Sequence, residues 1–135
     1  MKDSLDGYDV FTRVSDTVIR AKLYNCGDVE ANCIISLGGM SDGKPYIGIG
    51  TMNFILNNTT VLSLNKIQRQ GLDDEVRINM SNQLIEGYKN GKKTGNIYNQ
   101  YKVSGNFFTI PNGEGILDIT NVLDNIGIQY DYLYF

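Results

Sequence analysis

Polar and apolar side chains alternate strictly along Glu75-Val76-Arg77-Ile78-Asn79-Met80. Successive side chains of a β-strand point to opposite faces of its sheet, so this spacing places Val76, Ile78 and Met80 together on one face. The polar side chains share the other face. The stretch therefore predicts a half-buried strand whose apolar face lies in a core.

Similar short runs recur on both sides of this strand, separated by clusters of turn residues. The runs that we expect to form strands are residues 8–14, 17–24, 33–37, 46–56, 60–64, 75–80, 107–110, 115–120 and 126–135. Turns such as Asn57-Asn58 and Asn90-Gly91 contain Gly and Asn, because both residue types tolerate a positive φ. Residues 81–89 are the one stretch with helical character, and this stretch is short and contains Gly87.

Many short strands with closely spaced turns are typical of a β-sandwich, whereas an α/β fold would need several helices. We therefore predict an all-β, antiparallel β-sandwich with jelly-roll-like or Greek-key connections and at most one short helix. A chain of 135 residues has the length of one domain. Residues 1–7 are expected to be a flexible amino-terminal segment, and residues 8–135 a single domain.

The composition is that of an ordinary globular protein, with 41% hydrophobic and 20% charged residues. The chain contains no His, which excludes Ser-His-Asp and Cys-His nucleophilic pairs and His-ligated zinc. We therefore do not expect an enzyme, and we expect neither a cofactor nor a metal ion.

The formal net charge is −3, so the protein has no broad positive field that would attract phosphates. Nucleic acid is therefore not an expected partner. No apolar run is long enough to span a bilayer, so we do not expect membrane insertion.

Three local patterns each favour a structural interpretation. Residues 38–44 fit the start of a phosphate-binding loop, but Pro45 stands where that motif needs a Ser or Thr, so we expect a loop between strands. Asp73-Asp74-Glu75 is expected to be a group of solvated turn carboxylates, with a calcium site as the alternative. Cys26 and Cys33 form either two thiols or one small disulfide loop, and we expect reduced, partly buried thiols.

One segment mixes aromatic and amide side chains in a way that suits binding. Tyr98 and Tyr101 lie among Asn96 and Asn99, and such a mixture can grip a saccharide through stacking and amide hydrogen bonds. We take Asn96, Tyr98, Asn99 and Tyr101 as candidates for contact with a carbohydrate or a partner protein. The alternative is that these side chains only pack at an edge strand or an interface.

Three segments together resemble the carboxyl-terminal domain of siphophage-type distal tail proteins. They are the turn Asn25-Cys26-Gly27-Asp28-Val29-Glu30, the stretch Val103-Ser104-Gly105-Asn106-Phe107-Phe108-Thr109-Ile110-Pro111-Asn112-Gly113-Glu114-Gly115, and the closing Ile126-Gly127-Ile128-Gln129-Tyr130-Asp131-Tyr132-Leu133. The second is similar to the family's Ser-Gly-x-Phe-x-x-Ile-x-x-Gly-Glu-Asn pattern, and the third to its terminal strand. The order and spacing agree over about residues 12–135.

This resemblance implies a galectin-like β-sandwich at the tail tip or baseplate of a phage particle. The implied function is a structural or adhesion domain that contacts other tail proteins and further copies of the chain. Binding of host cell-envelope polysaccharide is the alternative. Such a protein would be made in the host bacterial cytoplasm and reside in the virion. The galectin sugar site is not implied, because it needs a His and a Trp that this chain lacks.

Overall fold

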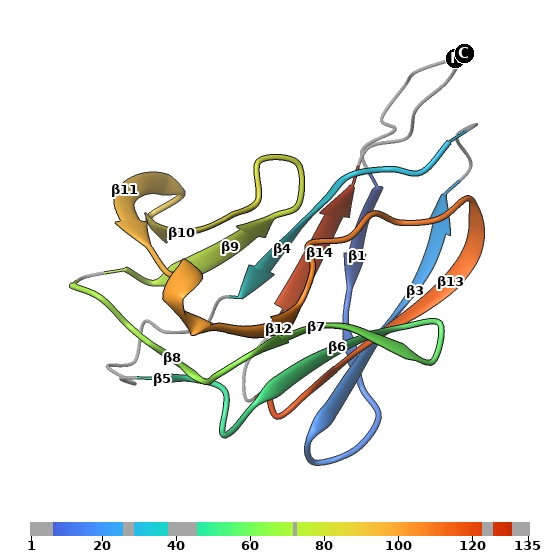
Figure 1. The fold of residues 1–135 in the computed structure, drawn as a ribbon, viewed down its shortest axis with the longest axis horizontal. Helices are drawn as coiled ribbons and strands as arrows, with labels where there is room; N and C mark the ends of the chain where they lie inside the picture. The colour runs from blue at the N-terminus through green and yellow to red at the C-terminus, as the bar shows by residue number, and fades with distance from the viewer. Residues whose placement is uncertain (1–6, 26–28, 38–45, 72, 123–125, 131–135) are drawn as a thin grey trace.

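The computed structural model describes residues 7–25, 29–37, 46–71, 73–122 and 126–130, and these residues form two six-stranded sheets and a two-stranded ribbon (Figure 1). The first sheet has the order β1 (Gly7–Val10), β14 (Ile126–Tyr130), β4 (Cys33–Leu37), β9 (Glu75–Asn79), β10 (Leu84–Lys89) and β11 (Lys92–Ile97). The second sheet has the order β12 (Lys102–Gly105), β7 (Thr59–Leu64), β6 (Met52–Leu56), β13 (Gly113–Thr120), β3 (Val18–Asn25) and β2 (Thr12–Arg13). The ribbon pairs β5 (Tyr46–Ile47) with β8 (Ile67–Gln68).

Each of these strand pairings is antiparallel, so the predicted all-β, antiparallel class is confirmed. Within the described ranges, the helical structure is one 3₁₀ turn at Asn99–Tyr101. The jelly-roll order of connections stays a prediction. No helix in the described part of the chain has the length and apolar character that a membrane crossing needs.

The core consists of rows of apolar side chains that run across each sheet. In the first sheet, Ile78 of β9 lies opposite Ile35 of β4 on one side and Ile85 of β10 on the other, and all three are fully buried. A matching row in the second sheet joins Ile19, Ile119, Phe54 and Leu62. The rows of both sheets belong to one buried cluster, as expected for two layers that share a core.

The alternation predicted around Ile78 is confirmed. Val76, Ile78 and Met80 are buried, whereas the polar residues between them are only half-buried. On the outer face, the guanidinium of Arg77 donates two hydrogen bonds to Glu75, at 2.9 and 3.2 Å, and lies 4.0 Å from the centre of the Tyr88 ring. The ion pair between Arg77 and Glu75, with its guanidinium stacked on Tyr88, therefore pairs the two charged side chains on the outer face of β9.

The helical expectation for residues 81–89 is wrong, because β10 occupies most of that stretch. The side-chain oxygen of Asn79 accepts the backbone N–H groups of Ser81 and Asn82, and Gln83 adopts a φ of 59°. These contacts turn the chain back onto β9, and β10 then pairs along its neighbour. Pairing with a neighbouring strand therefore outweighs the local helix propensity.

Two other expectations about strands need correction, and further strands were not expected. Residues 46–56 are two strands rather than one, because Gly48 takes a φ of 84° between β5 and β6. Residues 107–110 form no strand, although Ile110 makes an isolated bridge to Ala31. Strands β11 and β12 were not expected from the sequence, because their mostly exposed side chains carry little apolar alternation.

Cys33 is a free, buried thiol, and burial raises its pKa to about 12. A buried thiol with such a pKa is a poor nucleophile at neutral pH. Cys26, residues 1–6, the loop at 38–45 and residues 131–135 lie outside the described residues.

Ile78→Ala is expected to lower the free energy of unfolding by about 2–5 kcal/mol, because it leaves a cavity in the central row of the first sheet. Urea unfolding followed by circular dichroism measures the loss. The matched control is Ile97→Ala, which removes a side chain that is 40% exposed and should cost less than about 1 kcal/mol. Equal losses for the two variants would contradict this core assignment.

Candidate functional site

Tyr98, one of the expected contact residues, lies inside the protein and is fully buried. Its hydroxyl donates a hydrogen bond of 2.5 Å to Oδ2 of Asp73 and accepts one of 2.9 Å from the backbone N–H of Gln70. Asn96 donates to the same Asp73 oxygen through its Nδ2, at 2.9 Å. These bonds fix the segment before β9 to the end of β11. The Asn96 Nδ2 and the Tyr98 hydroxyl thus have structural partners.

Asp73 is 1% exposed, so its predicted place among solvated turn carboxylates is wrong. It lies against Gly87 of β10: a Cβ atom at position 87 would be 2.6 Å from the Asp73 Cγ, too close for any side chain. Gly87, which argued against a helix in the sequence, therefore leaves the space that the buried Asp73 carboxylate occupies. Burial and the hydrogen bond to this carboxylate both raise the pKa of the Tyr98 hydroxyl.

Asn99 also has a structural position. Its Oδ1 accepts the backbone N–H of Ile85 at 2.8 Å, and its Nδ2 donates to the backbone carbonyl of Gln83 at 3.0 Å. The side chain thereby satisfies backbone groups at the start of β10, where the turn interrupts the ladder.

Tyr101, another member of the predicted set, lines a surface hollow. This hollow has a volume of about 420 Å³. We call it, together with the adjacent Tyr46, the Ile49 surface, which comprises Tyr46, Ile49, Gly50, Thr51, Asn65, Lys66 and Tyr101. Ile49 is 50% exposed, and the ammonium of Lys66 lies 4.5 Å from the centre of the Tyr46 ring.

Backbone hydrogen bonds hold the Ile49 surface in place. The N–H of Ile49 donates to the carbonyl of Asn121 at 2.9 Å, and the side-chain amide of Asn121 donates to the carbonyl of Thr51 at 2.8 Å. The N–H of Asn65 donates to the carbonyl of Tyr101 at 2.8 Å. A surface fixed in this way loses little conformational entropy when a partner binds.

A second and larger hollow, of about 580 Å³, lies beside the paired strands β3 and β13. We call it the Tyr24 hollow, and its lining residues are Lys22, Leu23, Tyr24, Asn57, Glu114, Gly115 and Ile116. The strand register places Tyr24 opposite Glu114 and Lys22 opposite Ile116. All four of these side chains are exposed, while Leu23 between them points into the core.

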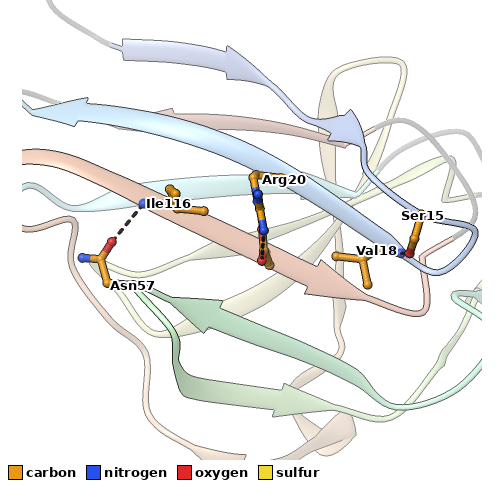
Figure 2. A network of polar contacts seen from close by, with 6 residues as sticks. Ser15, Val18, Arg20, Asn57 and Ile116 are labelled. Carbon is orange, nitrogen blue, oxygen red and sulfur yellow. Dashed lines mark hydrogen bonds and ion pairs between the residues drawn. The ribbon is translucent and has the colours of Figure 1, made fainter.

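Asn57 is held at the edge of the Tyr24 hollow by two bonds to β13. Its Oδ1 accepts the N–H of Ile116 at 2.9 Å (Figure 2). Its own backbone N–H donates to the Ile116 carbonyl at 2.9 Å. Gly115 leaves room for this side chain, because a Cβ atom there would lie 3.2 Å from the Asn57 Oδ1. The orientation of the Asn57 amide is therefore set before any ligand arrives.

Sequence reasoning did not find the Tyr24 hollow. Alternation along residues 17–24 was visible and places Lys22 and Tyr24 on one face. The sequence did not reveal which strand pairs with this one or in what register, since residues 22 and 116 are far apart along the chain. Strand pairing, rather than a local motif, assembles this hollow.

Tyr98→Phe is expected to lower the free energy of unfolding at neutral pH by about 1–3 kcal/mol, because the Asp73 carboxylate and the Gln70 N–H each lose a buried partner. Thermal or urea unfolding checks this. Tyr46→Phe, at a ring that is 38% exposed, is the matched control and should change stability little. A Tyr98→Phe variant as stable as the wild type would contradict the structural role of the hydroxyl.

The same variant should change the response to alkaline pH. The pKa of Tyr98 is raised in the folded state, so above the ordinary tyrosine value of about 10 the folded protein retains a proton that the unfolded chain releases. The Tyr98 contribution to stability is therefore present below pH 10 and is lost as the pH rises above it. Unfolding measured between pH 9 and 11 should show a shallower loss in Tyr98→Phe than in Tyr46→Phe.

Comparison of the chain with protein-family models, curated proteins and solved structures finds no match. What this protein binds must therefore be inferred from its own surfaces and from the sequence resemblance described above. The Ile49 surface and the Tyr24 hollow differ in chemistry: the first has a lysine stacked on an aromatic ring, and the second has charged side chains around an exposed ring.

Proposed function

We propose that this chain is a structural and adhesion domain of a phage tail tip or baseplate, which contacts other tail proteins at the tail periphery. The three segments that resemble distal tail proteins support this assignment, and they imply an antiparallel β-sandwich. The fold agrees with that implication at the level of class.

The Ile49 surface is the observation that carries the proposal. Interfaces between proteins are rich in aromatic side chains and are anchored by apolar groups in well-packed positions. Ile49 and Tyr46 supply exposed apolar area, and Tyr101 lines the same hollow as Ile49 and Lys66. A partner side chain that filled this hollow would bury Ile49 without displacing any of the backbone bonds around it.

The alternative, binding of host polysaccharide, remains a prediction for the segment from Asn96 to Tyr101. Asn96 and Tyr98 already use their polar groups on Asp73, and the Tyr98 ring is buried. Asn99 bonds to backbone groups of β10 and its preceding turn, while Tyr101 lines the Ile49 surface, so the segment gives a saccharide little to contact. The protein-contact function is therefore the one that this part of the structure favours.

The test is incorporation into phage particles. A phage lacking this gene is complemented with the wild-type chain or with Ile49→Asp, and purified particles are analysed by mass spectrometry and immunogold electron microscopy. We expect the wild-type chain at the tail tip and at least about a tenfold loss for Ile49→Asp, because a buried interface cannot accommodate an unpaired carboxylate.

Ile97→Asp is the control, since it places the same charge at an exposed position on the first sheet. It should be incorporated like the wild type. Absence of the wild-type chain from particles would overturn the tail assignment, and normal incorporation of Ile49→Asp would remove the Ile49 surface from the proposed interface.

A further inference from the structure

Two charged side chains, Lys22 and Glu114, line the Tyr24 hollow. Within the described ranges, neither the Lys22 ammonium nor the Glu114 carboxylate takes part in an ion pair. Further along the same two strands, by contrast, Arg20 and Asp118 form a bidentate pair with hydrogen bonds of 2.8 and 3.1 Å. The hollow therefore offers both a donor and an acceptor of hydrogen bonds to a ligand.

A third polar group points to the same ligand chemistry. The Oδ1 of Asn57 is occupied by the N–H of Ile116 (Figure 2). Within the described residues its Nδ2 group has no acceptor. Because this amide is already oriented by β13, its Nδ2 can donate to a ligand with little loss of entropy. The hollow thus has two donors, the Lys22 ammonium and the oriented Nδ2 of Asn57, and one acceptor, at Glu114.

Apolar area accompanies these polar groups. Tyr24 is 56% exposed and Ile116 is 40% exposed, so a ring and an aliphatic side chain flank the charged residues. Rigid aromatic rings are effective contact surfaces because they lose few rotamers on binding. The volume of about 580 Å³ lies within the usual range for small-ligand sites, about 300–1,000 Å³.

This combination excludes several ligand classes. A phosphate or another anion would be repelled by the Glu114 carboxylate, which lines the same hollow. A purely apolar ligand would remove the polar groups of Lys22, Asn57 and Glu114 from water without giving them hydrogen-bond partners. A pyranose fits each requirement, because it has an apolar face for Tyr24 and hydroxyls that both donate and accept hydrogen bonds.

We propose that the Tyr24 hollow binds an uncharged saccharide unit of a polysaccharide, stacked on Tyr24. Its hydroxyls donate to Glu114 and accept from Lys22 and from the Asn57 Nδ2. The hollow is open to solvent, so a single unit binds weakly, and a polysaccharide gains affinity from repeated units on multiple copies of the domain. This site is separate from the Ile49 surface and does not depend on assembly into a tail.

The test is a titration of the whole ¹⁵N-labelled chain followed by NMR. The probes are methyl β-D-glucopyranoside, methyl N-acetyl-β-D-glucosaminide and a tetramer of N-acetylglucosamine, with cyclohexanol and inorganic phosphate as controls. We expect saturable shifts at Gly115, Ile116 and the Asn57 side-chain amide with at least one saccharide, and no saturable shifts there with either control.

Variants assign the binding to the proposed groups. Tyr24→Ala should weaken saccharide binding at least about tenfold, whereas Tyr24→Phe, which keeps the ring, should bind within about twofold of the wild type. Glu114→Gln should weaken binding several-fold, since it removes the charge from the acceptor. Tyr46→Ala, on the Ile49 surface, is the matched control and should bind normally.

The proposal is overturned if none of the three saccharides gives saturable shifts, if Tyr24→Ala binds as well as the wild type, or if phosphate binds in the hollow more tightly than the sugars. Because Tyr24 is exposed, its variants should retain the dispersed spectrum of the folded chain. Phage particles play no part in this experiment, so its failure is distinguishable from a failure of the tail assignment.

Discussion

The pairing of β3 with β13 is the constraint on which both the core and the binding surfaces depend. Its register runs from Gly113 opposite Asn25 to Thr120 opposite Val18 without interruption. The same register that buries Leu23 exposes Lys22 and Tyr24 on the outer face. A slip by one residue would exchange the two sets, so the free energy of core burial also holds the hollow in its geometry.

The sequence predicted strands correctly where one face of the strand is buried. It was misleading where contacts between distant segments decide the local conformation. Alternation around Ile78 predicted its strand and its buried face, and Gly and Asn marked most of the turns. Residues 81–89 were misjudged because strand pairing to β9 outweighs their helix propensity. Strands β11 and β12 lie at the two sheet edges, where exposed side chains need no apolar alternation.

The candidate sites were less predictable than the fold, for a physical reason. The pattern of Asn and Tyr at residues 96–101 is the same whether the side chains face a ligand or a buried acceptor such as Asp73. Nothing local in the sequence shows that Gly87 leaves space for that carboxylate. The Tyr24 hollow likewise depends on Asn57 meeting β13, a contact between distant segments.

Ion pairing differs between the outer faces of the two sheets. Charged side chains already held in ion pairs stabilise the fold, whereas unpaired ones can bind a ligand. On the first sheet Arg77 pairs with Glu75 within β9, and Lys93 of β11 pairs with Glu86 of β10, so a ligand there would have to break ion pairs that already exist. On the second sheet Arg20 and Asp118 form an ion pair, whereas Lys22 and Glu114 are exposed and pair with no charged group in the part of the chain that the structure describes. Groups that exchange water for ligand hydroxyls lose little, because each hydrogen bond is replaced by another of similar strength. Recognition is therefore least costly at the end of β3 and β13, where Tyr24 adds apolar contact area to that exchange.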